Sequence, residues 1–276
     1  MANTDREHIP GTRLRQIGDF KTPSFVQRSE GNPVLSCEQV PYPSTNTHNC
    51  GVIRYGDGYV MLFRNDARES RDNPNQAATC VGIADSPDGY RWTVRPQPAF
   101  EAHDPRITEL DGRFYINCAE AGGASTWVTD DFTRFEKIEQ TLPGTRNQVI
   151  FPEKINGKYY RLERPMWQPN MFVVNAGKAP GGWIGPPWDI WITESTDLLH
   201  WGQATELLRT DQLDYANAKI GAGAPPIRTD RGWLCIIHGD DIDPRRGKNG
   251  WEPRWHGRYH AGAMLLDLED PRKVIA

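Results

Sequence analysis

Long hydrophobic runs, net charge and paired cysteines are all scarce in this 276-residue sequence. No stretch approaches the roughly 18 apolar residues of a membrane span, and the first residues are polar rather than a secretory signal. The charge of −4, from 32 basic and 36 acidic residues, gives no reason to expect nucleic acid or a membrane surface as a partner. We therefore expect a soluble protein.

The cysteines are too few and too scattered to form a disulfide framework. They are an odd number, five, and no two of them form a C-x-x-C pair of the kind that binds zinc or carries out redox chemistry. Their positions are Cys37, Cys50, Cys80, Cys118 and Cys235. We expect a cytoplasmic location, no metal and no other cofactor.

Long helical periodicity is nearly absent, and a hairpin pattern repeats in its place. The pattern is an apolar strand, a turn that contains glycine, and an aromatic strand. The four copies surround Gly58, Gly112, Gly157 and Gly232, and we predict that each glycine lies in a hairpin turn. The ten Trp and nine Tyr residues fit many short strands with aromatic faces.

A second motif follows three of these hairpins: a strand, an acidic turn and an aromatic residue, near Asp88, Asp131 and Asp197. Four-strand units that recur at roughly 40–50 residues are typical of β-propellers. We predict one all-β domain over residues 1–276, a five-bladed β-propeller. For the last blade two alternatives remain: a C-terminal piece is missing, or the N-terminal segment closes the ring.

Four segments together resemble glycoside hydrolase family 130, the β-mannoside phosphorylases and related β-mannosidases. They are R-S-E-G-N-P-V-L at Arg28–Leu35, H-D-P-R-I at His103–Ile107, K-I-G-A-G-A-P-P-I at Lys219–Ile227, and L-L-D-L-E-D-P-R-K-V near the end. The resemblance implies a five-bladed propeller and cleavage of a β-mannoside by inorganic phosphate, with inversion, to give α-mannose 1-phosphate. His103 stands where the family usually has Glu, which leaves the acceptor sugar open.

Asp104 is the candidate catalytic acid. Pro105 fixes its own φ and disfavours helix for the residue before it, so the carboxylate enters a strand from a rigid turn. A turn aspartate that accepts backbone N–H bonds is the alternative on the residues alone. The resemblance implies the catalytic role.

Phosphate is already a charged nucleophile, so a phosphorolytic site needs cations rather than a catalytic base. Candidate cations recur at corresponding places in successive hairpin units, namely Arg146, Arg164, Lys219 and His238. The alternative for each is a solvated or paired surface charge. By resemblance these residues match the phosphate-binding positions of the family, and Tyr259 supplies a hydroxyl donor.

The resemblance also implies a sugar site formed by Asn49 and Arg64, with Asp66 and His103 as weaker candidates. Four tryptophans crowd the longest insertion, and we expect a partial role for them at the substrate mouth, with side packing as the alternative. They are Trp167, Trp183, Trp188 and Trp191.

Three other functions stay open: a β-mannoside hydrolase, a non-catalytic carbohydrate-binding propeller, and a glycosidase acting on arabinose or fructose. A hydrolase would need a second carboxylate to activate water and would not need the cations. The G-x-G within Gly221–Pro226 is no dinucleotide site, because two prolines follow it. The expected partners are a β-mannoside oligosaccharide and phosphate, and a homo-oligomer stays open.

Overall fold

The structure is a computed structural model, and nearly all of its regular structure is β-strand. Two short 3-10 segments, η2 (Cys37–Gln39) and η4 (Thr210–Gln212), are the helical elements of the described part. The described residues are 17–18, 21–67, 78–120, 123–140, 145–165, 188–202, 204–242 and 257–276. The prediction of an all-β fold is confirmed.

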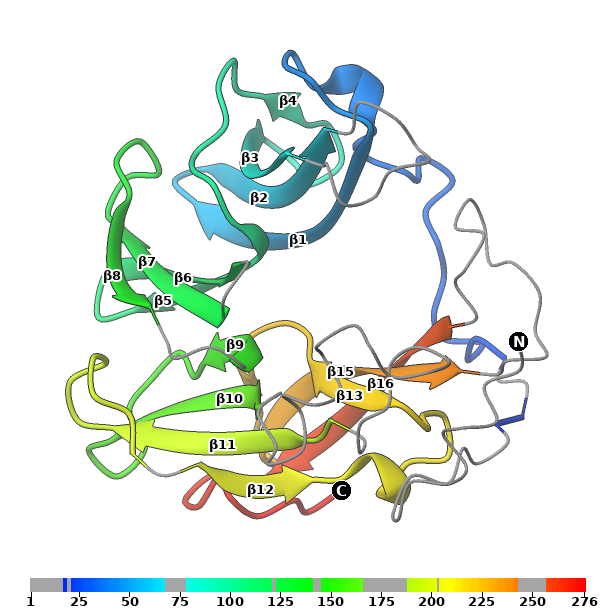
Figure 1. Cartoon of the computed structure of the whole chain (residues 1–276), viewed down its shortest axis with the longest axis vertical. Coiled ribbons are helices and arrows are strands. Elements are labelled where there is room, and N and C mark those ends of the chain that lie inside the picture. The colour runs from blue at the N-terminus through cyan, green and yellow to red at the C-terminus, as the bar shows by residue number, and fades with distance from the viewer. Residues whose placement is uncertain are drawn as a thin grey trace, which may run out of the picture.

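The strands form four antiparallel four-stranded sheets arranged around a centre (Figure 1). The first holds β1 (Asn46–Tyr55), β2 (Gly58–Ala67), β3 (Ala78–Ser86) and β4 (Thr93–Val94). The second holds β5 (His103–Leu110), β6 (Arg113–Glu120), β7 (Gly123–Thr129) and β8 (Glu136–Gln140). The third holds β9 (Thr145–Ile150), β10 (Tyr159–Pro165), β11 (Ile190–Ser195) and β12 (Thr205–Leu208).

The fourth sheet holds β13 (Lys219–Ala222), β14 (Ile227–Arg228), β15 (Trp233–Ile242) and β16 (Gly257–Leu266). It departs from the meander of the other three, because β13 and β14 lie end to end along one edge of β15 while β16 takes the other edge. Radially arranged four-stranded sheets make a β-propeller. That prediction is confirmed with four blades; the described ranges contain no fifth.

Two predicted hairpin turns have the backbone that their glycines allow. Asp111 and Gly112 have φ of 52° and 77°, and Asn156 and Gly157 have φ of 51° and 78°. Two successive positive φ values define the type I′ turn, which matches the twist of paired strands and favours Asn-Gly and Asp-Gly. Gly112 and Gly157 therefore lie in hairpin turns, as predicted.

The other two predicted turn glycines, Gly232 and Gly58, have different positions relative to their turns. Gly232 ends the turn between β14 and β15, where its carbonyl accepts the Thr229 N–H. Gly58 lies one residue beyond its turn, because it begins β2 and pairs with Tyr55. Gly56, with a φ of 57°, takes the left-handed position there.

The acidic turns repeat with the same hydrogen bonds in three blades. Asp88 accepts the backbone N–H groups of the second and third residues after it, and Asp131 and Asp197 do the same. Such Asx turns stabilise a tight bend by local bonds alone. The matching geometry supports the repeat that was read from the sequence.

Apolar faces pack between neighbouring blades. Leu62 of β2 and Ile116 of β6 are fully buried in the cluster between the first two blades. Phe151 meets Trp233 edge-to-face at 5.3 Å in the cluster that joins the last two. Because these faces fill the space between blades, the polar groups at the starts of the inner strands are left to line the centre.

Candidate active site

Asp104 lies at a β-bulge near the start of the inner strand β5. The register with β6 shifts between His103 and Arg106, and Asp104 has a left-handed φ of 57°. A left-handed non-glycine residue is uncommon and marks a site where the surroundings impose the conformation. The bulge turns the carboxylate out of the regular alternation of the strand.

Asn49 lies at a matching bulge on the neighbouring inner strand β1. Its φ is 48°, and the register of β1 with β2 shifts between His48 and Gly51. Its side-chain Nδ2 donates to Asp104 Oδ1 at 2.8 Å. Gly51 permits the close approach, because a Cβ there would lie 2.9 Å from the Pro105 carbonyl oxygen.

Arg64 of β2 is the second donor to the same carboxylate. Its Nη1 lies 3.3 Å from Asp104 Oδ1, and its Nε donates to Asp66 Oδ1 at 2.9 Å. Asp66 is 0 % exposed, so it lies behind Arg64 rather than on the surface of the site. Sequence reasoning placed Asp66 with the sugar-binding residues and had no signal for this burial.

Opposing effects act on the pKa of Asp104. Burial by itself raises the pKa, but the Asn49 hydrogen bond and the positive charges of neighbouring groups, Arg64 and Arg106 among them, outweigh burial and lower it. The carboxyl is therefore ionised near neutral pH with these neighbours alone.

His103 joins the acid to the cations of the next blade. Its Nδ1 lies 2.9 Å from the Ala119 carbonyl oxygen, which can only accept, so Nδ1 carries the proton. Nε2 is then an acceptor and lies 3.4 Å from Arg146 Nη1. Burial lowers the pKa of His103, which keeps the ring neutral and able to accept from Arg146.

Arg164 is a buried cation on β10, directly across from Arg146 of β9. It is 6 % exposed, its Nη1 donates to the Ile220 carbonyl at 3.3 Å, and its guanidinium lies 5.7 Å from the Trp188 ring centre. Its Nε has no hydrogen-bond partner among the described residues. Burial lowers the pKa of Arg164 to about 10.

Gly221 lets β13 pass against two of the predicted cations. A Cβ at this position would lie 2.9 Å from His238 Nε2 and 3.1 Å from Arg164 Nη1. The glycine thus lets the backbone approach the centre closely. Burial, then Arg164, Arg106 and Lys219, lower the pKa of His238 to about 3.

Lys219 and Tyr259 complete the predicted phosphate group. Lys219 Nζ lies 3.5 Å from Asp240 Oδ2 and 5.4 Å from the Tyr259 ring centre. The His238 ring lies 5.9 Å from the same tyrosine, which is 47 % exposed. The predicted phosphate residues therefore lie on neighbouring strands of the last two blades, β9 and β10 of the third and β13, β15 and β16 of the fourth.

Arg106 is a residue of this site that sequence reasoning missed. Its Nε donates to the Gly223 carbonyl at 2.8 Å, Nη1 to the Asp104 carbonyl at 3.0 Å, and Nη2 to the Ala222 carbonyl at 3.4 Å. One guanidinium thus connects the acid-bearing strand to the β13 segment of the fourth blade. The motif H-D-P-R-I contains it, but carbonyl acceptors leave no trace in a sequence.

The arrangement places one carboxylate beside a group of cations. The lowered pKa values of Arg164 and His238 have part of their cause in neighbouring positive charges, so the charged groups here are close enough to repel one another. His238 itself, with a pKa of about 3, is neutral near pH 7. A bound anion relieves such repulsion and accepts charge-assisted hydrogen bonds. The site can therefore combine proton donation with anion binding.

Comparison with known proteins identifies the family. The sequence profile of glycoside hydrolase family 130, described as beta-1,4-mannooligosaccharide phosphorylase, matches residues 25–276. The chain belongs to glycoside hydrolase family 130. The resemblance seen in the four sequence motifs is thereby confirmed.

Among its family 130 relatives is the beta-1,4-mannooligosaccharide phosphorylase of Ruminococcus albus, 29% identical over 90% of this chain and 71% of that protein. The beta-1,2-mannobiose phosphorylase of Listeria innocua is 33% identical over 71% of this chain. The matched part spans about half, 51%, of the length of that relative.

Solved structures agree with this family 130 assignment. The beta-1,2-mannobiose phosphorylase of Listeria innocua, in complex with beta-1,2-mannobiose, has a TM-score of 0.71 and 25% identity, covering 90% of this chain and 81% of that one. Another solved structure has a description stating that family 130 contains glycoside hydrolases that target beta-1,2 mannosidic linkages in Candida mannan. Its TM-score is 0.66 at 17% identity, and the match covers 96% of this chain and 82% of that one. The second likeness shows the fold alone.

Of the tryptophans predicted near the substrate mouth of this family 130 chain, Trp167 and Trp183 lie outside the described residues. Trp188 is buried beneath Arg164, and Trp191 lies on β11, where it pairs with Glu163. Trp188 therefore packs against Arg164 and does not form part of an exposed surface. A mouth role for the others stays a prediction.

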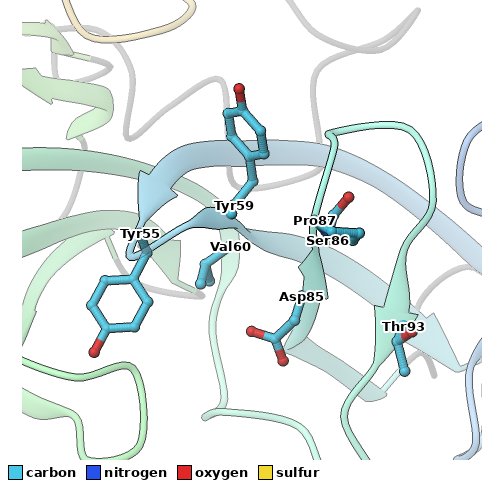
Figure 2. Close-up of a pocket in the computed structure, with 8 residues that line it drawn as sticks. Tyr55, Tyr59, Val60, Asp85, Ser86, Pro87 and Thr93 are labelled. Atoms are coloured by element: carbon cyan, nitrogen blue, oxygen red, sulfur yellow. The ribbon is translucent and has the colours of Figure 1, made fainter.

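Two cavities lie away from this site. The first, of about 280 Å³, is lined by Tyr55, Tyr59 and Asp85, and the two tyrosine rings point in opposite directions (Figure 2). Asp85 is already held there by two bonds of 2.7 Å from Arg95. The second cavity, of about 570 Å³, is lined mainly by the later residues of β1 and β5 and by the segment 224–227, beyond the predicted site residues.

The described residues contain no group of three His, Cys, Asp or Glu side chains that could hold a metal ion. Within the same ranges, no helix is long and apolar enough to cross a membrane. The expectation of a metal-free enzyme stays a prediction.

Proposed function

We propose that this family 130 protein is a β-mannoside phosphorylase that cleaves a β-mannoside with inorganic phosphate and releases α-mannose 1-phosphate. The observation that carries the proposal is the pairing of one positioned carboxylate, Asp104, with a group of buried and half-buried basic side chains. They are the cations Arg146, Arg164 and Lys219 and the neutral ring of His238, with Tyr259 beside them. The phosphorylase names of the relatives support it.

In the proposed reaction Asp104 gives its proton to the glycosidic oxygen as the bond from that oxygen to the anomeric carbon breaks. A phosphate oxygen attacks the anomeric carbon from the opposite face, which inverts its configuration. The products are the acceptor sugar, with a restored hydroxyl, and mannose 1-phosphate. No base is needed, because phosphate is already an anion.

The lowered pKa of Asp104 has to be reconciled with a role as acid. A bound phosphate would bring negative charge close to the carboxylate, and a nearby like charge raises a carboxyl pKa. Phosphate would thus act both as nucleophile and as the group that favours the protonated acid. Asn49 Nδ2 and Arg64 Nη1 both donate to Asp104 Oδ1, which leaves Oδ2 of the same carboxyl to carry the proton.

Hydrolysis would require a second carboxylate placed to activate water. Among the described residues, two buried carboxylates contact cations of the site: Asp66 contacts Arg64 at 2.9 Å, and Asp240 contacts Lys219 at 3.5 Å. This engagement favours phosphorolysis over the hydrolase alternative.

Several finer expectations belong to the same proposal. They are one catalytic domain over residues 1–276, a ring of five blades, and sugar contacts from Asn49, Arg64 and His103. A cytoplasmic location and the absence of a cofactor also stay predictions. The acceptor sugar is the part of the substrate that the proposal leaves open.

The test is an assay of β-1,2-, β-1,3- and β-1,4-mannobiose with and without phosphate. We expect mannose 1-phosphate from at least one of them, at a rate that rises from zero to saturation with phosphate concentration. Free mannose formed at a rate indifferent to phosphate would establish a hydrolase instead. Binding of a mannobiose without turnover would establish a carbohydrate-binding propeller.

A further inference from the structure

Asp66 is a fully buried carboxylate on β2 that no step of the proposed reaction uses. Its Oδ1 accepts from Arg64 Nε at 2.9 Å and from Thr79 Oγ1 at 2.8 Å, and its Oδ2 lies 3.2 Å from His48 Nε2. These donors come from the three adjacent strands β1, β2 and β3. Asp66 is 0 % exposed, so it can act on the site through buried neighbours such as these and not by direct contact with solvent.

The first neighbour, Arg64, leads directly to the acid. A guanidinium is planar, so the bond from its Nε to Asp66 fixes the direction in which its Nη1 points. Nη1 points at Asp104 Oδ1, 3.3 Å away. Asp66 therefore sets the orientation of one of the two donors to the acid.

The second neighbour, His48, leads to the other donor. His48 directly precedes Asn49, at the point where the register of β1 with β2 shifts. Asn49 is held in a left-handed conformation there, and its Nδ2 reaches Asp104 Oδ1 at 2.8 Å. The contact between His48 and Asp66 fixes β1 at the residue directly before that bulge.

We infer that Asp66 is a positioning residue for the general acid, which holds through Arg64 and His48 the two donors that orient the Asp104 carboxylate. The inference rests on the proposed function, since it assigns Asp66 a part in proton donation by Asp104. Both hydrogen bonds that described side chains make to the Asp104 carboxylate end on Oδ1. Holding that oxygen directs Oδ2 at the leaving group.

The decisive experiment is a double-mutant cycle between Asp66→Asn and Asp104→Asn. We expect Asp66→Asn alone to lower kcat by about 10- to 100-fold, as a misplaced catalytic group does, with the KM for phosphate within about twofold of wild type. Added to Asp104→Asn, it should change the residual rate by less than about twofold, because the group it positions is gone. Full additivity of the two losses would overturn the inference.

A milder variant covers the case in which Asp66→Asn does not fold. Thr79→Val removes one donor to Asp66 at nearly constant volume, so we expect a several-fold loss of kcat that again disappears in the Asp104→Asn background. The matched control is Asp85→Asn, which breaks another Asp–Arg pair of the same blade. A kcat loss from the control equal to that of Thr79→Val, or no loss from Thr79→Val, would contradict a positioning role.

A crystal structure of a folded Asp66 or Thr79 variant separates this inference from the proposed function. A displaced Arg64 and Asp104 carboxylate would support positioning even if no mannobiose were phosphorolysed, in which case the proposed function alone would fail. An unmoved carboxylate in an active enzyme would overturn positioning and leave the proposed function standing.

Discussion

The arginines in the two halves of the site have pKa values shifted in opposite directions. On the acid half, Arg64 bonds to Asp66 and adjoins Asp104, and these carboxylates raise its pKa although burial acts to lower it. On the phosphate half, Arg164 bonds to a main-chain carbonyl, and burial lowers its pKa to about 10. The side chains are the same, and the difference lies in their partners.

The acid half thus has its charges balanced by protein groups, whereas the phosphate half has positive charge in excess. His238 shows the same excess, because burial and three neighbouring cations hold its pKa at about 3. Such repulsion is relieved by an anionic ligand, so the excess of positive charge supports the phosphate binding that we propose for this half. Three variants test this division, from the largest expected effect to the smallest.

Asp104→Asn tests the acid half. The amide keeps the shape of the side chain but has no transferable proton, so we expect turnover to fall by about 10²–10⁴. The phosphate half should be unaffected, and phosphate should still raise the melting temperature at least as much as in wild type. Initial rates of mannose 1-phosphate release and thermal melts measure the two effects. A loss of turnover below about tenfold would refute the acid role.

Arg164→Lys tests the phosphate half. Lysine keeps the charge but cannot form the planar, two-pronged contact of a guanidinium with phosphate. We expect the KM for phosphate to rise by about 10- to 100-fold, the worth of a charge-assisted hydrogen bond, with a smaller change in mannobiose KM. Arg113→Lys, in an exposed pair with Asp130, is the matched control. An unchanged phosphate KM would show that Arg164 is only structural.

His238→Gln tests the charge excess without substrate. The pKa of His238 is about 3 in the native state against 6.5 in its ordinary state. Between these pH values the unfolded chain binds a proton that the native protein does not, so stability falls as pH drops below about 6.5. At pH 5 this proton lowers the free energy of unfolding of the wild type by about 2 kcal/mol, and the variant, which lacks the histidine, should keep that stability. Melting curves at pH 7 and pH 5 in phosphate-free buffer measure this loss of stability. An equal fall in melting temperature for wild type and variant would exclude the effect.

The sequence predicted the parts of the molecule that depend on local chemistry. Turn glycines such as Gly112 and Gly157, acidic turns such as Asp88, and the pairing of Asp104 with Pro105 all act within a few residues. The turn pattern led to the propeller. The turn before Pro105 made Asp104 a candidate, and the family resemblance gave it the catalytic role.

The parts that were missed depend on distant partners. The burial of Asp66 depends on donors from neighbouring strands, and the bulge at Asn49 shows only when β1 is aligned with β2. The irregular fourth blade follows from its split inner edge, β13 and β14. A strand pattern read along one segment contains none of this information.

The hydrogen bonds of Arg106 do not depend on the side chains of the residues to which it donates. Its three bonds end on the main-chain carbonyls of Asp104, Ala222 and Gly223, the last 117 residues away. Every residue type offers such a carbonyl, so substitutions at those three positions leave the acceptors in place. Side chains in the site can therefore vary while the spacing between the strand that carries Asp104 and the end of β13 stays constant.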